Sequence, residues 1–117
     1  MEARAVAREI RMSPRKVRLV ADQIRGRSVS DAMSALRFSK RAASIPVEKT
    51  LLSAVANVRE KADEEGEALD IDELTVRRIF VDGGPTHRRW RAGAMGRPKP
   101  RRRRTSHITV VVEAKEG

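Results

Sequence analysis

The 117-residue sequence has no cysteine and very few aromatic residues, with one tryptophan, two phenylalanines and no tyrosine. Without cysteine, disulfides, thiolate zinc sites and a cysteine nucleophile are excluded. With so few aromatics, the core has to be built from valine, isoleucine, leucine and alanine. No run of about 18 apolar residues occurs, and the N-terminal residues contain no apolar signal core, so we expect neither a membrane span nor a secretory leader.

Motifs of catalysis and metal binding are missing as well. The two histidines, His87 and His107, stand outside any metal motif such as His-Glu-x-x-His. No P-loop, dinucleotide fingerprint or nucleophile elbow is present. Residues 60–73 hold eight Asp and Glu against one lysine, which is typical of a solvated loop and not of the desolvated site that a general acid or base needs. We expect a protein that is not an enzyme and has no cofactor and no metal.

Positive charge is what the sequence has in excess. The net charge is +10 and the pI about 11.3, which indicates a polyanionic partner, either nucleic acid or an anionic membrane surface. Residues 1–41 carry a net +7, residues 42–85 a net −5 and residues 86–117 a net +8. A chain of this kind can turn two basic surfaces to one partner while its acidic middle faces water.

Hydrophobic periodicity and capping signals predict three helices. Ser13 is expected to cap the first, which ends at Gly26. The second starts at 28–31 and ends near Phe38, and the third runs from about Ser44 to Glu64. Pro46 is expected in the first turn of the third, because an interior proline would break it. The predicted buried stripes are Val17, Val20, Ala21 and Ile24; Val29, Ala32, Met33 and Leu36; and Val47, Leu51, Ala54, Val55, Val58 and Ala62.

Three strands are predicted, at 2–10 as an edge strand, at 74–81 and at 105–112. Between the last two lies a basic segment, 86–104, with nine Arg and Lys and no acid, whereas the other 98 residues together hold only +1. Its glycines and prolines, Gly93, Gly96, Pro98 and Pro100, lead us to expect no helix and no clean strand ladder through its middle. The segment is therefore either a floppy loop or a loop ordered by a polyanion.

Arginine offers a planar fork of donors to phosphate oxygens, so we expect this segment to bind nucleic acid. Trp90, amid three arginines, is expected to stack on a base or on a neighbouring arginine; the alternative is an anchor at the base of the segment. The residues assigned to RNA are Arg88, Arg89, Trp90, Arg91, Arg97, Lys99, Arg101, Arg102, Arg103 and Arg104.

A second basic element lies at the start of the first helix, where free N–H groups and the helix dipole favour phosphate. Its alternative reading is an exposed face with ion pairs such as Arg18 with Asp22. The residues assigned to RNA here are Arg11, Ser13, Arg15, Lys16 and Arg18.

Four segments resemble, in order and spacing, the family of bacterial large-subunit ribosomal protein twenty-two. They are Ser13-Pro14-Arg15-Lys16-Val17-Arg18-Leu19-Val20-Ala21-Asp22 with Ile24-Arg25-Gly26; Ser53-Ala54-Val55-Ala56-Asn57; Ile79-Phe80-Val81-Asp82 with Gly84-Pro85; and Arg104-Thr105-Ser106-His107-Ile108-Thr109-Val110-Val111-Val112. The similarity covers essentially the whole chain, and the segments are specific only in combination.

The resemblance implies one α+β domain, 1–117, with three helices packed on a three-stranded antiparallel sheet and one long protruding β-hairpin at about 82–106. It implies a structural constituent of the cytoplasmic large ribosomal subunit that binds and bridges the large-subunit (23S) rRNA, beside neighbouring ribosomal proteins. Ser106 and His107 would join the rRNA contacts. The hairpin tip would line the polypeptide exit tunnel and meet the nascent peptide, through His87, Arg88, Arg89, Trp90, Arg91, Ala92, Gly93, Ala94 and Met95.

Two other classes of function fit the sequence less well. A small DNA-compacting protein would need a base-reading helix or a dimer interface, and no second apolar stripe for a dimer is evident. A membrane-surface binder would need a strongly apolar face beside the basic one, and the basic segment has only Trp90, Met95 and scattered alanines. We therefore expect RNA as the partner, with no DNA and no self-association.

Overall fold

A three-stranded antiparallel sheet, open on one face, forms the centre of the molecule. The structure is a computed structural model, and it describes residues 1–92, 96 and 98–114. The elements follow in the order β1 (Glu2–Ile10), α1 (Pro14–Ile24), α2 (Val29–Phe38), α3 (Ser44–Glu64), the short 3-10 helix η1 (Ile71–Glu73), β2 (Leu74–Gly83), β3 (His87–Ala92), β4 (Pro98–Arg103) and β5 (Ser106–Ala114). The strand order is β1-β5-β2, so β1 is an edge strand as predicted. The predicted α+β fold with a protruding hairpin is confirmed.

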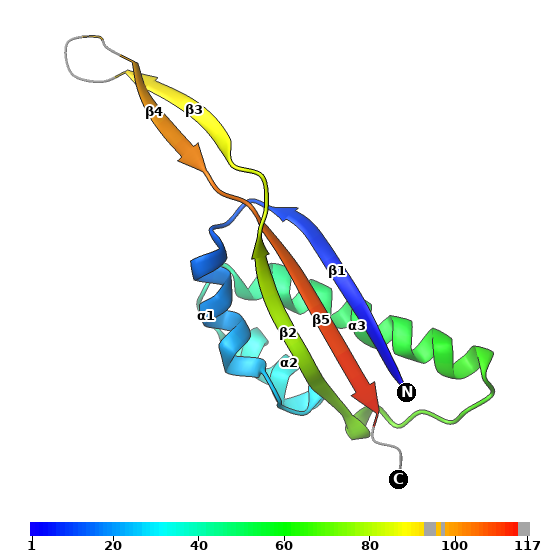
Figure 1. Cartoon of the computed structure of the whole chain (residues 1–117). Coiled ribbons are helices and arrows are strands. Elements are labelled where there is room, and N and C mark those ends of the chain that lie inside the picture. Colours follow the sequence, from blue (N-terminus) through cyan, green and yellow to red (C-terminus); the bar gives the residue numbers. More distant parts are fainter. Residues whose placement is uncertain (93–95, 97, 115–117) are drawn as a thin grey trace.

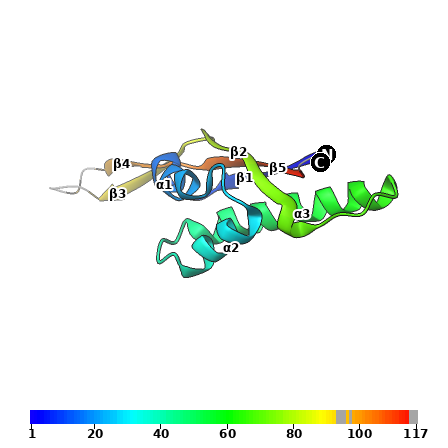
Figure 2. The same ribbon diagram turned by 90° about the horizontal axis from the view of Figure 1, so that it is seen from below.

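The helices pack on one side of the sheet and leave the other side without a helix (Figures 1 and 2). α3 contacts β1 and β5, and α1 contacts β2. The predicted stripes of α1 and α3 are all buried, and α2 buries Val29, Ala32 and Leu36, with Met33 partly buried beside them. They pack on the inward residues of the strands, which are Leu74, Val76, Ile79, Val81, Ile108, Val110 and Val112.

Both phenylalanines lie outside this core. Phe38 is 87% exposed and Phe80 is 44% exposed. The prediction of an aliphatic core is confirmed for the described residues, and the aromatic side chains described here are on the surface.

Of two local predictions, the serine cap of α1 holds only in part and the place of Pro46 is confirmed. Ser13 occupies the N-cap position of α1 and Pro14 the next one, but the Ser13 side chain makes no capping hydrogen bond. The cap forms at α2 instead, where Ser28 Oγ accepts a hydrogen bond from the Asp31 N–H at 3.2 Å. Pro46 lies in the first turn of α3, as predicted.

The hairpin is a two-stranded ribbon that leaves the sheet at the end away from both termini (Figure 1). Its register runs from His87↔Arg103 to Ala92↔Pro98. The expectation of no clean ladder was wrong at Pro98 and Pro100, because both lie within β4; Gly93 lies outside the described residues. Pro98 and Pro100 are two residues apart, so their missing N–H groups would face the same edge of β4. In a two-stranded ribbon the N–H groups of alternate residues have no strand to pair with, so two prolines at alternate positions are compatible with the ladder.

The hairpin makes the molecule elongated, with extents of 67 × 27 × 16 Å and a radius of gyration of 17.7 Å. A compact domain of this length has a radius of gyration of about 13 Å. The predicted tip residues Gly93, Ala94 and Met95, and the predicted RNA contact Arg97, lie outside the described residues.

Two adjacent leucines of α3 test the packing. Leu51 is fully buried and Leu52 is 47% exposed. Leu51→Ala should lower the free energy of unfolding by about 2–5 kcal/mol, because a cavity remains in an aliphatic core. Leu52→Ala should change it by less than about 1 kcal/mol. Urea denaturation followed by circular dichroism measures both, and equal losses would contradict the assigned helix face.

Candidate nucleic-acid interface

The hairpin ladder places positive residues opposite one another. Its register pairs Arg88 with Arg102, Arg89 with Arg101, and Arg91 with Lys99. Directly opposite residues of an antiparallel pair have Cβ atoms about 4.5–5.5 Å apart, and like charges there are destabilising. The ribbon therefore concentrates positive charge and carries no acid in 86–104 to offset it. Such an arrangement is suited to a surface lined with phosphates.

Close packing at Gly84 joins the hairpin to the sheet. The Gly84 N–H donates to the Thr105 carbonyl at 2.9 Å, and the Thr105 hydroxyl donates to the Pro85 carbonyl at 2.6 Å. A Cβ at position 84 would lie 2.5 Å from Thr105 Oγ1 and 3.2 Å from His107 Cε1. Only glycine fits at this position without moving its neighbours.

Ser106 and His107 hold the same junction from the other side. Ser106 is fully buried, and its hydroxyl donates to the Met12 carbonyl at 2.6 Å. His107 Nδ1 accepts a hydrogen bond from the Glu9 N–H at 3.0 Å, at a point where Glu9 has a φ of 54° and the β1–β5 register shifts. The family resemblance implied rRNA contacts for both residues. The structure instead places the Ser106 side chain in the interior and uses one ring nitrogen of His107 within the fold.

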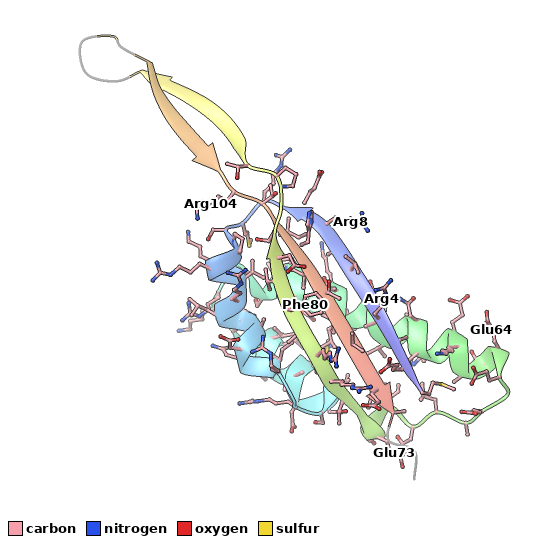
Figure 3. The ribbon with its side chains drawn as sticks, viewed as in Figure 1. Arg4, Arg8, Glu64, Glu73, Phe80 and Arg104 are labelled. Atoms are coloured by element: carbon pink, nitrogen blue, oxygen red, sulfur yellow. The ribbon has the colours of Figure 1, made fainter. Side chains whose placement is uncertain are left out.

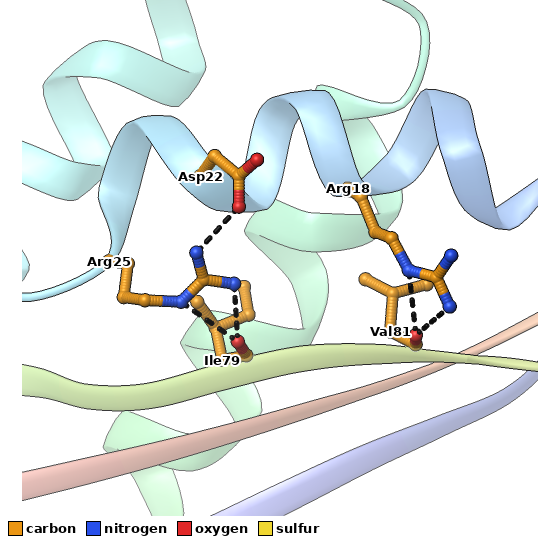
Figure 4. A network of polar contacts seen from close by, with 5 residues as sticks. All are labelled: Arg18, Asp22, Arg25, Ile79 and Val81. Carbon is orange, nitrogen blue, oxygen red and sulfur yellow. Dashed lines mark hydrogen bonds and ion pairs between the residues drawn. The ribbon is translucent and has the colours of Figure 1, made fainter.

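Arg18 of α1 and Arg25, the residue directly after α1, bind the outer edge of β2 (Figure 4). Arg18 donates from Nε and Nη2 to the Val81 carbonyl at 3.1 and 2.9 Å. Arg25 donates from Nε and Nη2 to the Ile79 carbonyl at 3.3 and 2.9 Å. Ile79 and Val81 are alternate residues of an edge strand, so these carbonyls have no neighbouring strand to pair with.

The ion pair suggested between Arg18 and Asp22 is therefore wrong. Asp22 pairs with Arg25, with Oδ1 and Nη1 2.5 Å apart. The spacing of Arg18 and Arg25, seven residues, puts both on one side of α1, but it does not show which carbonyls the two side chains reach. Arg18 binds the Val81 carbonyl through Nε and Nη2, and its Nη1 takes no part in this contact.

The opposite edge of the sheet is closed in a similar way by α3. Asn57 Nδ2 donates to the Arg4 carbonyl at 2.9 Å, and Lys61 Nζ donates to the Glu2 carbonyl at 3.2 Å. Residues 57 and 61 are one helical turn apart, and residues 2 and 4 are alternate positions of β1. Both edges of the sheet thus receive side-chain donors from the helices.

The remaining basic residues at the start of α1 are open to solvent. Arg11, Arg15 and Lys16 are exposed, and none of them forms an ion pair with a described residue. α1 begins beside the base of the hairpin (Figure 1). Ser13 is half-buried there. The two basic elements predicted from the sequence, far apart along the chain, are therefore neighbours at one end of the molecule.

Charge is separated along the length of the molecule. Arg8 and Arg104 lie toward the hairpin, whereas Glu64 and Glu73 lie at the opposite end (Figure 3). The acidic residues of 60–73 are all exposed. A basic end and an acidic end fit a protein whose hairpin end contacts a polyanion and whose other end faces water.

No helix within the described ranges is long and apolar enough to cross a membrane. A search of the same residues for groups of three or more His, Asp or Glu side chains that could hold a metal ion finds none.

Comparison with known proteins identifies the relatives of the chain. A family model described as "Ribosomal protein L22p/L17e" matches residues 5–113. The chain is 50% identical to a protein of Bifidobacterium longum (strain DJO10A) over 100% of the chain and 98% of that relative. It is 53% identical to a protein of Desulfitobacterium hafniense (strain DSM 10664 / DCB-2) over 99% of the chain and 98% of that relative. Both relatives are named "Large ribosomal subunit protein uL22".

Adjacent glycines provide a test of the hairpin junction. Gly84→Ala should lower the free energy of unfolding by about 1–3 kcal/mol, because its Cβ pushes the Thr105 hydroxyl off the Pro85 carbonyl. Gly83→Ala is the matched control, since the nearest atom to its Cβ is Pro14 Cγ at 4.0 Å. Thermal unfolding measures both, and a Gly84→Ala protein as stable as the Gly83→Ala protein would contradict the junction described here.

Proposed function

Because the chain belongs to the ribosomal protein L22p/L17e family, we propose that its hairpin and the start of α1 bind and bridge the RNA of the large ribosomal subunit. The chain is a structural component of that subunit and not an enzyme, as the sequence predicted. Its partners are ribosomal RNA and other ribosomal proteins. The proposal concerns which surfaces make the RNA contacts.

The like-charge ladder of the hairpin is the observation that carries the proposal. Arginine faces arginine across β3 and β4, and the segment 86–104 holds nine positive charges without an acid. Repulsion across the ladder opposes pairing of the two strands. Phosphates on either side of the ribbon remove that repulsion and release their counterions, so binding and ordering of the hairpin support each other.

The start of α1 supplies a second contact at the hairpin base. Arg11, Arg15 and Lys16 are exposed and form no ion pair with any residue that the structure describes, so their charges are available to phosphates. Nη1 of Arg18 can also bind phosphate, although Nε and Nη2 of the same side chain bind the Val81 carbonyl of β2. Contacts of this kind position a protein on RNA without reading its sequence. Ser106 and His107 we assign to holding the junction.

The resemblance to the family supports a further role for the tip. We propose that the segment predicted as the tip, His87–Met95, lines the polypeptide exit tunnel and meets the nascent peptide through its residues farthest from His87, because the His87↔Arg103 pair lies at the base of the hairpin and not at its tip. The elongated shape supports this, because β3 and β4 extend well beyond the aliphatic core. The core residues whose burial is described lie in the helices, at Ala43 and in the three-stranded sheet, which supports a hairpin that serves the ribosome more than the fold.

Single charge removals test the second contact. Arg15→Ala and Lys16→Ala should each weaken binding to a large-subunit rRNA transcript and lower the slope of log affinity against log salt by about one. Arg59→Ala is the matched control, because Arg59 is also exposed but lies toward the acidic end of α3. Filter binding at several salt concentrations gives the slopes, and unchanged slopes for both α1 variants would show that this surface is only solvated.

Shortening the hairpin tests the tip. His87 and Arg103 are register partners, so Arg88–Arg102 can be replaced by an Asn-Gly turn that joins them directly. The shortened protein should keep its far-UV circular dichroism and thermal midpoint and should still enter subunits, because the core is untouched. Its ribosomes should form peptide bonds normally on short messages but respond differently to macrolides or to stalling peptides.

Two outcomes would overturn parts of this picture. If the shortened protein fails to fold alone, the hairpin belongs to the core and the one-domain organisation with a separable hairpin is wrong. If it folds and assembles while antibiotic response and stalling are both unchanged, the tunnel role of the tip is wrong, and only RNA binding by the hairpin arms survives.

A further inference from the structure

The open face of the sheet carries a group of six side chains, four of them exposed, that neither the core nor the hairpin uses. Two adjacent cross-strand rows lie at its middle. In one, Arg4 is opposite Val111, which is opposite Arg78; in the next, Val6 is opposite Thr109, which is opposite Phe80. Arg4, Val6, Arg78 and Phe80 are all exposed. We call these six residues the Phe80 surface.

The arginines of this surface have no partner within the described part of the chain. Arg4, Arg8 and Arg78 form no ion pair and no side-chain hydrogen bond there. The neighbouring Arg77 behaves differently, because its Nη1 lies 2.6 Å from Glu2 Oε2 and 3.6 Å from Glu113 Oε1. Glu2 and Glu113 thus pair with Arg77 at the end of the sheet near the termini.

Phe80 is an unusual residue to expose in this protein. Only three of its residues are aromatic, and the core contains none of those described. A phenylalanine placed on an open β-sheet beside arginines presents one ring face for stacking, and the arginines present donors for phosphates. Successive same-face residues of one strand, such as Arg78 and Phe80, are about 6.6 Å apart. A base on the ring therefore brings its phosphates within reach of the arginine.

The surface is also continuous with the hairpin. Arg8 lies on β1 between Arg4 and the base of the hairpin, and Arg104 lies at that base (Figure 3). Asp82, at the hairpin end of the sheet, is opposite His107 and outside the two central rows. An RNA strand held by the hairpin can thus continue along the open face without meeting an acid in those rows.

We propose that the Phe80 surface is a second RNA-binding surface, which stacks an unpaired base of ribosomal RNA on Phe80 and holds the adjoining phosphates with Arg4 and Arg78. This inference rests on the proposed RNA-binding function and adds a surface and a class of ligand to it. The ligand is single-stranded RNA, because a base inside a duplex has no free face for the ring. A protein partner on this face is the competing occupant, and the experiments below separate the two.

Substitutions at Phe80 in the full-length chain test the stacking. Phe80→Leu keeps an apolar side chain but removes the ring, and it should weaken binding to an oligouridine of about ten nucleotides by about tenfold. Phe80→Tyr should bind as the unsubstituted chain does. Arg78→Gln should weaken binding and lower the salt slope by about one, whereas Arg59→Gln should not. Binding to an RNA duplex of equal length should respond to Arg78→Gln and not to Phe80→Leu.

A photo-crosslinking residue at position 80 identifies the occupant in assembled large subunits. Crosslinks to ribosomal RNA support the proposal, and crosslinks to a ribosomal protein overturn it. An unchanged oligouridine affinity for Phe80→Leu, with circular dichroism showing an intact fold, also overturns it. Either result rules out the Phe80 surface as an RNA-binding surface, but the proposed function still holds if the unsubstituted chain binds the rRNA transcript. If the unsubstituted chain does not bind that transcript, the proposed function itself fails.

Discussion

The pairing of β2 with β5 is the contact on which both the core and the hairpin depend. The ladder runs from Leu74↔Ala114 to Gly83↔Ser106, buries the inward residues of both strands against the helices, and then continues into β3 and β4. Between the two ladders, three residues, 84–86, oppose two, 104–105. An unequal count of this kind bends a ribbon, as a β-bulge does. The close fit of Gly84 against Thr105 fixes that bend, so the direction of the hairpin is set by packing inside the body.

The basic end then follows from topology. α1 is held on the outer edge of β2 by the guanidinium groups of Arg18 and Arg25. That contact places the start of α1, with Arg15 and Lys16, next to the hairpin base. The start of α1 and the hairpin, far apart along the chain, together form one electropositive end, while the end of the molecule with Glu64 and Glu73 is acidic. The separation of charge seen in the sequence is thereby turned into a separation in space.

Much of the fold was predictable, because periodicity and capping are local. The bounds of α3 and the buried stripes of α1 and α3 agree with the sequence prediction. The failures concern partners distant along the chain. The effect of Pro98 and Pro100 depends on which edge of the ribbon their missing N–H groups face, and Arg18 and Ser106 bind carbonyls 63 and 94 residues away. A residue type shows which bonds are possible, but only the packing shows which partner is present.

The side-chain donors along both sheet edges have a consequence for the chain between its synthesis and its arrival in the ribosome. An uncovered edge strand invites a strand from another molecule, and this is a common route to aggregation. Here Arg18 and Arg25 occupy carbonyls of β2, and Asn57 and Lys61 occupy carbonyls of β1. Three of these four donors are charged groups, which also repel an incoming copy. The helices that complete the core thus also keep both sheet edges from pairing with another molecule before the chain has bound its RNA partner.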